Sequence, residues 1–297
     1  MEKVRDELFV HCRSLSVGRL SALSCVMLVL MACEPPAQTQ VTAEVRNQTI
    51  NPAGVANPSK PAAGAATNED FAARIYTNAA HKTLPYRLLT PKNYDVKQKY
   101  PVVLFLHGAA ARGDDNEKQL DWGARFFLEP LARDKYPCFL VVPQCPRGSS
   151  WVESSLGGGL REAEPALLSI EVVGSLAREF SIDLKRFYLT GVSMGGHAVW
   201  TCVIRQPERF AAGVPVCGSG DPGSVTDPIA KKTPVWAFHS DDDHLVNVQF
   251  ARDMVKAWKD HGGVAKYTEY TGLKHGSWKK AYLEADLFAW LFAQQRP

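Results

Sequence analysis

The sequence predicts a single α/β domain whose sheet is mostly parallel, with helices on both faces. Short apolar runs alternate with helix-like segments along most of the 297 residues, and such alternation is the signature of an α/β fold. Residues 101–106, PVVLFL, form a continuous apolar run, as do strands buried on both faces of a parallel sheet. The composition, with 45% hydrophobic and 22% charged residues, agrees with a globular protein built around one large core.

The expected elements follow one another in a regular order. Residues 71–77 and 84–90 alternate loosely between apolar and polar side chains across a polar stretch, so we expect an antiparallel pair at the start of the sheet. Only a short loop is expected over residues 218–233, which predicts little or no cap over the sheet. The further strands are expected at residues 101–106, 138–142, 186–189, 211–216, 235–239 and 265–270, and the helices at about 117–133, 162–180, 194–205, 248–261 and 277–295.

Residues 1–33 resemble an export signal. Arg13 and Arg19 precede an apolar run over residues 20–32, which is the arrangement of a secretory signal peptide. The run is shorter than the roughly 20 apolar residues of a membrane span. It ends in Leu30-Met31-Ala32-Cys33, similar to the lipobox of bacterial lipoproteins. This resemblance implies a lipid on Cys33 and an exported, membrane-anchored protein that faces the periplasm or the cell exterior. Cleavage without lipidation and an uncleaved anchor are the alternatives.

The rest of the chain divides into a linker and one domain. Residues 34–68 are rich in Pro, Ala, Asn, Thr and Gln, a composition that predicts a flexible linker and leaves residues 69–297 as the globular domain. The formal net charge is +3. Nucleic-acid binding proteins carry a marked basic patch, so this near-balance gives no reason to expect a nucleic-acid partner.

Four cysteines fall in the globular domain: Cys138, Cys145, Cys202 and Cys217. In an oxidising compartment they would permit disulfides, although Cys138 and Cys145 flank an expected strand and are too far apart for a mutual bridge. Buried free thiols are the alternative. The sequence contains no C-x-x-C pair and no Cys/His spacing of a structural zinc site, and we expect neither a metal nor a cofactor.

The motif Gly191-Val192-Ser193-Met194-Gly195 joins an expected strand to an expected helix. A G-x-S-x-G sequence in that setting is a nucleophile elbow, in which a tight turn exposes the serine and the glycines let neighbouring backbone approach. Ser193 is therefore the candidate nucleophile. Because a serine hydroxyl is weakly nucleophilic at neutral pH, it requires a base and a third group to orient that base.

The partners of Ser193 are expected in the order acid, then histidine. His275 lies in a glycine-flanked loop after the last expected strand and is the candidate base, whereas His197, in the first helical turn after the elbow, is expected to be structural. For the acid we favour Asp243. Asp241 and Asp242 could instead be turn or capping residues, and Asp221, one strand earlier, is the alternative acid. The residues from His239 to His244 also allow a metal-site interpretation, but strand and turn geometry explains the cluster without one.

An oxyanion hole is expected from two backbone N–H groups. Met194 follows the nucleophile and supplies one. Ala109 supplies the other, in the small-residue loop that follows strand 101–106. The polar residues after that loop are expected to hold it and to start the next helix, and they are Arg112, Asp114, Asp115 and Asn116. Trp151, in a further loop after a strand, either forms a wall of the substrate pocket or packs internally.

Five sequence blocks resemble those of one family. They are residues 101–108 with 112–116, residues 143–146 with Trp151, the elbow, the Asp243 loop, and His275-Gly276-Ser277-Trp278. Together they are similar to the compact bacterial α/β-hydrolases, a group that includes phospholipase/carboxylesterases, dienelactone hydrolases and esterase-like peptidases. The sequence departs from the family at Ala110, where relatives have glycine, and at Ser240-Asp241, where relatives have Gly-Ala.

The resemblance implies an α/β-hydrolase fold with a Ser193, Asp243, His275 triad and with Ala109 and Met194 as oxyanion donors. The residues themselves indicate the same chemistry, a serine hydrolase that cleaves carboxylic esters through an acyl-enzyme. The expected substrate is a small-molecule or polymer-attached ester, because little would cover the site. A serine peptidase, an esterase of acetyl or feruloyl groups on polysaccharides, and a non-catalytic binding protein on a hydrolase scaffold are the alternatives.

Overall fold

The computed structural model describes residues 70–155 and 159–297. The predicted export signal, Cys33 and the predicted linker therefore lie outside the described residues. Eight strands form one sheet in the order β1-β2-β4-β3-β7-β8-β9-β10. The strands are β1 (Phe71–Thr77), β2 (Thr83–Leu89), β3 (Tyr100–Leu106), β4 (Phe139–Pro143), β7 (Ile182–Val192), β8 (Ala212–Val216), β9 (Val235–Ser240) and β10 (Ala265–Tyr270).

The sheet is antiparallel only at its beginning. β1 pairs antiparallel with β2, and β2 antiparallel with β4, whereas every pair from β4 through β3 and β7 to β10 is parallel. The predicted antiparallel opening and the mostly parallel sheet are both confirmed. In a parallel arrangement the carboxyl ends of β3, β7, β8 and β9 meet at one edge of the sheet, where ligands of open α/β folds bind.

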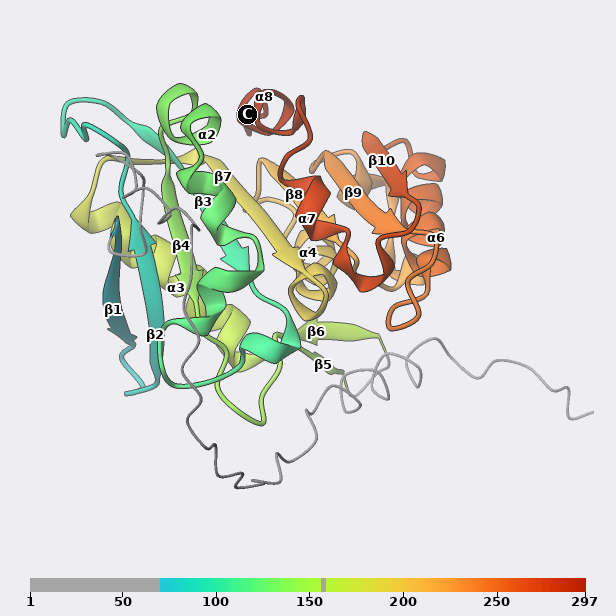
Figure 1. The fold of residues 1–297 in the computed structure, drawn as a ribbon, viewed down its shortest axis with the longest axis horizontal. Helices are drawn as coiled ribbons and strands as arrows, with labels where there is room; N and C mark the ends of the chain where they lie inside the picture. Colours follow the sequence, from blue (N-terminus) through green and yellow to red (C-terminus); the bar gives the residue numbers. More distant parts are fainter. Residues whose placement is uncertain (1–69, 156–158) are drawn as a thin grey trace, which may run out of the picture.

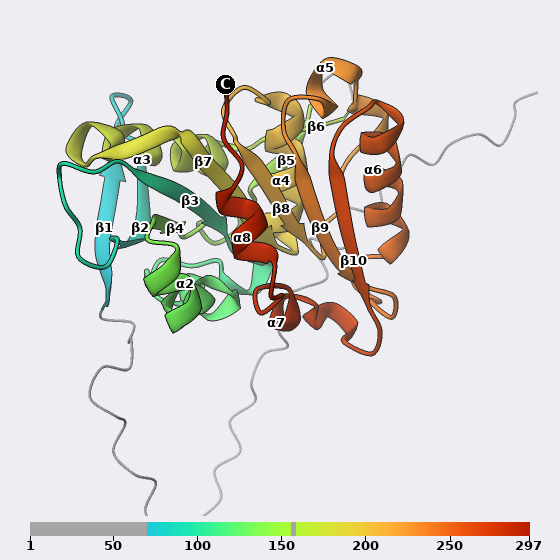
Figure 2. The same cartoon turned by 90° about the horizontal axis from the view of Figure 1, so that it is seen from above.

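Helices cover both faces of the sheet (Figures 1 and 2). Alternation along β3 separates the two cores: Val102 and Leu104 pack in a cluster with α3, α4 and α6, while Val103 and Phe105 pack on the other face with α2, α7 and α8. This follows from the two-residue period of a strand. The helices are α2 (Pro130–Lys135), α3 (Glu164–Glu179), α4 (Met194–Arg205), α5 (Asp227–Ala230), α6 (Val248–Asp260), α7 (Trp278–Ala281) and α8 (Leu287–Phe292).

Two predicted helices are shorter or broken. The helix expected at 117–133 consists of two 3₁₀ segments, η3 (Lys118–Trp122) and η4 (Ala124–Leu128), followed by α2. Gly123 between them has φ +129°, a value outside the helical region, and the residue before Pro130 is extended, as proline favours. The helix expected at 277–295 is divided into α7 and α8 around Tyr282, whose ring is buried in the core.

Smaller elements complete the domain. A separate two-stranded hairpin, β5 (Val152–Ser154) with β6 (Leu160–Glu162), was not predicted, and neither was the short helix α5. The 3₁₀ segments η2 (Ala109–Ala111), η5 (Pro222–Ser224) and η6 (Lys274–Gly276) lie in loops. Within residues 70–155 and 159–297, no helix combines the length and the apolar character that a membrane crossing requires.

Candidate active site

Ser193 stands on a sharp turn between the last residue of β7 and the first residue of α4. Its backbone has φ 56° and ψ −114°, a conformation that a non-glycine residue adopts only where the surroundings enforce it, at a cost of about 1–3 kcal/mol. The surroundings do so here: Ser193 N–H donates to the Val216 carbonyl at 2.9 Å. A Cβ on Gly195 would lie 1.8 Å from the Leu106 carbonyl oxygen, so only glycine permits β3 and α4 to approach this closely.

His275 connects the serine to a carboxylate. Its Nε2 lies 2.8 Å from Ser193 Oγ and its Nδ1 lies 2.7 Å from Asp243 Oδ2. Both contacts have hydrogen-bond length, and the acid can orient the ring only with the proton on Nδ1, which leaves Nε2 free to accept from the serine. Ser193 and His275 are 82 positions apart in the sequence, and Asp243 and His275 are 32 positions apart. The three side chains nevertheless form one continuous line of hydrogen bonds. The arrangement can activate a serine oxygen for attack on a carbonyl carbon.

The carboxylate of Asp243 is buried and well supplied with donors. Its Oδ1 accepts from the backbone N–H groups of Leu245 at 2.9 Å and Val246 at 3.0 Å. Burial by itself raises the pKa of Asp243, but the hydrogen bonds from His239, His275 and Val246 outweigh it and hold that pKa well below 3.8. Asp243 is therefore ionised at neutral pH, as a group that stabilises a protonated imidazole must be.

A second histidine, His239, lies behind the acid and was not assigned a site role from the sequence. It is fully buried, and its Nε2 lies 3.3 Å from Asp243 Oδ2 and 2.9 Å from the Val246 carbonyl oxygen. Its Nδ1 has no partner among the described residues. The proton therefore belongs on Nε2, from which it reaches the carbonyl and the carboxylate. His239 thus contacts the acid loop at both Asp243 and Val246. Its place at the end of β9, just before the acid loop, is the sequence feature that could have identified it.

The other aspartates considered as the acid form hydrogen bonds with groups other than His275. Asp242 Oδ1 accepts from Lys274 N–H at 2.9 Å, which ties the acid loop to the loop of His275. Asp241 Oδ2 accepts from Thr271 Oγ1 at 2.8 Å. Asp221 caps η5 by accepting from Gly223 N–H at 3.0 Å. Only Asp243 contacts His275, so the geometry selects it among the candidates.

The two expected oxyanion donors are the backbone N–H groups of Met194, which follows Ser193, and of Ala109, which follows Gly108. Those of Met194 and Ala109 have no hydrogen-bond acceptor among the residues that the structure describes. Gly108 lies directly beside the nucleophile, because a Cβ at Gly108 would stand 3.5 Å from Ser193 Cβ. The N–H groups of Met194 and Ala109 are therefore free to donate to an oxyanion, which keeps both as candidates for that role.

The loop that carries Ala109 is held by buried polar groups. His107 Nδ1–H donates to the Gly108 carbonyl at 2.7 Å, and His107 Nε2 accepts from Cys145 N–H at 2.9 Å. Burial lowers the pKa of His107 to about 4, so it acts as a neutral connector between the ends of β3 and β4. Arg112 donates from Nε to the Ala109 carbonyl at 3.1 Å.

Gln144 completes the support of this loop. Its side chain donates to the Ala111 carbonyl at 3.2 Å and to Asp115 at 2.9 Å, and it accepts from Asn116 N–H at 2.7 Å. The expected role of Arg112, Asp115 and Asn116 agrees with these contacts, whereas Asp114 is exposed and faces Arg147 at 3.5 Å. Sequence reasoning missed His107 and Gln144, although each is the first polar residue after an apolar strand.

Trp151 packs internally and does not line a substrate pocket. Its side chain is fully buried, and its indole N–H donates to the His107 carbonyl at 2.9 Å. The ring lies edge-on to the His107 imidazole at 5.0 Å between centroids. The assignment of Trp151 to the pocket is therefore corrected in favour of packing, because a side chain with no exposed surface cannot contact a substrate.

His197 is structural in its contacts. It is buried, and its Nδ1 accepts from Ser219 N–H at 2.7 Å. Burial lowers the pKa of His197 to about 4, so the neutral ring joins the start of α4 to the loop after β8. Cys138, Cys145, Cys202 and Cys217 are all buried and unpaired, which selects the free-thiol alternative.

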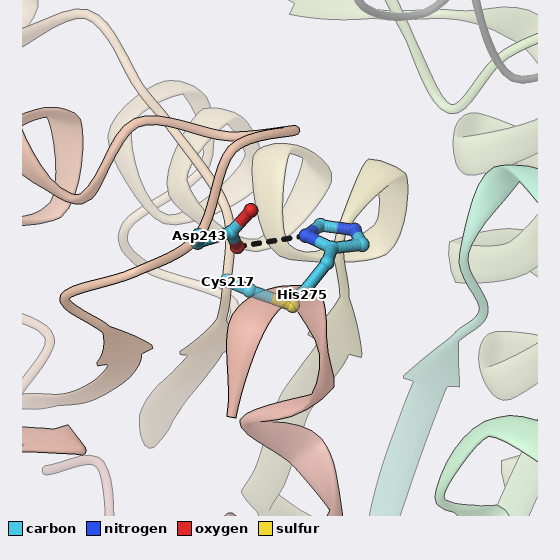
Figure 3. Close-up of side chains that lie close together, drawn as sticks. All are labelled: Cys217, Asp243 and His275. Carbon is cyan, nitrogen blue, oxygen red and sulfur yellow. Dashed lines mark hydrogen bonds and ion pairs between the residues drawn. The ribbon is translucent and has the colours of Figure 1, made fainter. Parts of the chain in front are cut away.

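Cys217, Asp243 and His275 are the group with metal-ligand character within the described part of the chain (Figure 3). Their ligand atoms lie within 4.8 Å of one another. Burial, assisted by the Asp243 charge, raises the pKa of the Cys217 thiol to about 12, whereas a metal binds the thiolate. Asp243 and His275 are also directed at each other, as the dashed line in Figure 3 marks. Asp243 and His275 are thus engaged in the line of hydrogen bonds to Ser193, and this arrangement is favoured over a metal site.

Comparison with known proteins identifies the family. Residues 77–269 match the sequence model of the Esterase family, described as "Putative esterase". The chain belongs to this esterase family. Among curated proteins, the bifunctional acetylxylan esterase/xylanase of Neocallimastix patriciarum is 25% identical over 54% of this chain and 22% of its own length. The "Probable carboxylesterase SOBER1-like" of Arabidopsis thaliana is 26% identical over 58% of this chain and 71% of its own.

Solved structures give the same classification. A thermostable esterase is 38% identical, with a TM-score of 0.71, over 77% of this chain and 64% of that one. A ferulic acid esterase, 15% identical with a TM-score of 0.60 over 75% of this chain and 97% of that one, shares the fold. The match thus spans about two thirds of the thermostable esterase and less than a quarter of the acetylxylan esterase/xylanase. The predicted membership of the esterase group of α/β-hydrolases is confirmed.

Proposed function

We propose that this protein hydrolyses carboxylic esters, with Ser193 as nucleophile, His275 as general base and acid, and Asp243 as the group that orients His275. The observation that carries the proposal is the continuous line of hydrogen bonds from Ser193 Oγ through His275 to Asp243. Esterase family membership supports the reaction class.

The geometry supports the following steps. Ser193 Oγ forms a bond to the ester carbonyl carbon while its proton passes to His275 Nε2, and the carbonyl oxygen gains charge beside the Ala109 and Met194 N–H groups. The C–O bond to the alcohol then breaks, and His275 returns the proton to the leaving alkoxide. Water attacks the acyl-enzyme with the same base, which releases the carboxylic acid and regenerates the serine.

Ser193→Ala tests the assignment. Because a triad acts as a unit, we expect turnover of p-nitrophenyl acetate to fall by about a million-fold, with an unchanged thermal unfolding midpoint. The wild-type protein should react with a fluorophosphonate probe and the variant should not. Unlabelled wild-type protein would instead favour the non-catalytic binding protein.

A comparison of rates on different substrates would show which class of ester this protein cleaves. Acetylxylan and feruloyl esterases occur among the relatives and structural neighbours by name, which supports an ester attached to a polysaccharide. An acylaminoacyl peptidase from Pyrococcus horikoshii shares the fold at 18% identity. Hydrolysis rates on acetylated xylan, p-nitrophenyl acetate and a peptide p-nitroanilide would distinguish a polysaccharide esterase, a general carboxylesterase and a peptidase. We expect the anilide to be the poorest substrate.

We also propose that residues 1–33 direct export and that Cys33 carries a lipid. The support is the sequence alone, in which Arg13 and Arg19 precede an apolar run over residues 20–32 that leads into Cys33. Mass spectrometry of the mature N-terminus tests it. A lipid mass on Cys33 is expected, and an unmodified chain that still begins at Met1 would contradict the proposal.

A further inference from the structure

The backbone turn in front of His275 has an unfavourable conformation. Gly272 has φ 77° and Lys274 has φ 50°, so two of the three residues before the candidate base lie in the left-handed region. Glycine adopts this region freely, whereas the Cβ of any other residue makes it unfavourable. Lys274 is exposed, so packing of its side chain does not enforce the conformation. Other groups must therefore hold the turn.

Two side chains at the end of β9 bind the backbone of this turn. Asp242 Oδ1 accepts from Lys274 N–H at 2.9 Å and from the Ser240 hydroxyl at 2.6 Å. Ser240 Oγ in turn accepts from Leu273 N–H at 3.2 Å. The two N–H groups directly before His275 are thus held by one hydrogen-bonded pair of side chains, and we call Ser240 and Asp242 the loop clamp.

The loop clamp is fixed in the sheet. Ser240 is fully buried, and its hydroxyl also lies 3.2 Å from the Tyr270 carbonyl oxygen at the end of β10, the strand that pairs with β9 at the edge of the sheet (Figure 1). The hydrogen bond from Ser240 lowers the pKa of Asp242, and the Lys274 N–H adds to this effect against desolvation. Asp242 is therefore an ionised acceptor at neutral pH, and hydrogen bonds to an ionised acceptor are stronger than those to a neutral one.

The position of this turn matters for the triad. The imidazole of His275 must reach Ser193 Oγ at 2.8 Å and Asp243 Oδ2 at 2.7 Å at the same time. Asp243 can orient the ring, but it does not hold the backbone from which the ring projects. If the residue before His275 left the left-handed region, the chain direction would change and the ring would move. A displacement of about 1 Å is enough to slow an enzyme about 100-fold.

We propose that Ser240 and Asp242 are positioning residues, which hold the turn in front of His275 in its left-handed form. The imidazole is thereby kept at hydrogen-bond distance from both of its partners. The inference rests on the proposed ester hydrolysis, because it assigns these residues an action through the base of that reaction and not on the reacting atoms.

Variants of the loop clamp test the proposal. Asp242→Ala removes the acceptor, and we expect kcat for p-nitrophenyl acetate to fall about tenfold. KM should change little, because the clamp acts on the base and not on substrate binding. Ser240→Ala leaves Asp242 in place and should lower kcat about three- to fivefold. Asp242→Asn keeps an oxygen that can accept from the Lys274 N–H and should recover most of the rate.

A change of backbone preference at Lys274 distinguishes positioning from packing. Glycine takes a positive φ without cost and alanine does not, while both keep the N–H group. In the Asp242→Ala protein, the added change Lys274→Gly should therefore raise kcat about threefold, and Lys274→Ala should leave it unchanged. A purely structural role of Asp242 would make no distinction between glycine and alanine.

Asp241→Ala is the matched control, because Asp241 lies in the same loop but accepts from Thr271 Oγ1 at 2.8 Å, ahead of the turn. Its kcat should stay within about twofold of the wild type. Wild-type kcat in both Asp242→Ala and Ser240→Ala would overturn the inference, as would a fall in kcat that Lys274→Gly does not relieve or that Asp241→Ala equals. Absence of both p-nitrophenyl acetate hydrolysis and fluorophosphonate labelling in the wild type would instead count against ester hydrolysis itself.

Discussion

Two histidine–aspartate pairs among the described residues have almost the same distance between Nδ1 and the carboxylate oxygen. His275 Nδ1 lies 2.7 Å from Asp243 Oδ2, and His261 Nδ1 lies 2.8 Å from Asp227 Oδ1. The first pair is largely enclosed, with 18% and 0% of the side chains exposed, whereas the second has 39% and 59% exposed. Only His275 has a serine hydroxyl on its other nitrogen. A close imidazole–carboxylate contact is thus not sufficient for chemistry.

The surroundings of the two acids explain the difference. Asp227 lies on the surface, and the hydrogen bonds from His261 and Lys231 lower its pKa. Asp243 is removed from water, and three directed donors compensate its burial. Surface pairs are screened by solvent and contribute little, while a buried, fully bonded carboxylate keeps its charge and its orientation. The following predictions compare the two pairs, from the largest expected effect to the smallest.

The histidines should differ most. His275→Ala removes the base and should lower kcat for p-nitrophenyl acetate by about 10⁶-fold. His261→Ala removes an exposed side chain at the end of α6 and should leave kcat within about twofold, because surface changes have small effects. Steady-state kinetics of the two variants tests this. A His275→Ala enzyme with more than a hundredth of the wild-type rate would contradict the assignment.

The aspartates should differ next. Asp243→Asn keeps the size of the side chain but removes the charge that stabilises protonated His275, and kcat/KM should fall by about 10⁴-fold. Asp227→Asn is the matched variant and should behave as the wild type. If the two asparagine variants have similar activity, the orienting acid lies elsewhere, and Asp242→Asn becomes the variant to compare.

His239 should have an intermediate effect, because it acts through Asp243. His239→Leu removes the donor to the Asp243 loop, and we expect kcat to fall about 10- to 100-fold with little change in KM, since small displacements of catalytic groups have effects of this size. His239→Gln can still place an N–H near the Val246 carbonyl and should recover much of the rate. Equal loss in both variants, with a lowered unfolding midpoint, would indicate packing only.

The smallest effect concerns stability and pH. The pKa of Asp243 is lower in the folded protein than its ordinary value of 3.8, so its ionised form stabilises the fold above about pH 4, and this contribution is lost as the pH falls further. Asp243→Asn should reduce the free energy of unfolding by about 1–3 kcal/mol near neutral pH, and the difference from the wild type should narrow below pH 4. Urea denaturation from pH 7 to pH 3 measures both quantities, with Asp227→Asn as the exposed control.

Much of the site was predictable because parallel strands impose an order on chemistry. Ser193, Asp243 and His275 each follow a strand whose apolar run is visible in the sequence, and strands of a parallel sheet end at one edge. The glycines of the elbow could also be predicted from the sequence motif, because the turn leaves no room for a side chain at residues 191 and 195. The helices at 117–133 and 277–295 were not predictable, because their breaks depend on Gly123 and on the burial of Tyr282 against β3 and β7.

The sequence by itself determined the α/β class, the order in which the residues of the site follow their strands, and the residue types needed to activate Ser193. It could do so because periodicity and motif spacing are local properties. Tertiary structure decided which of three neighbouring aspartates faces His275, that His239 and His107 support the site from within, and that Trp151 is buried. It also decided that Trp122 and Trp278, 156 positions apart in the sequence, bring their ring centroids within 5.7 Å of each other. These outcomes depend on contacts between distant segments, which no local pattern encodes.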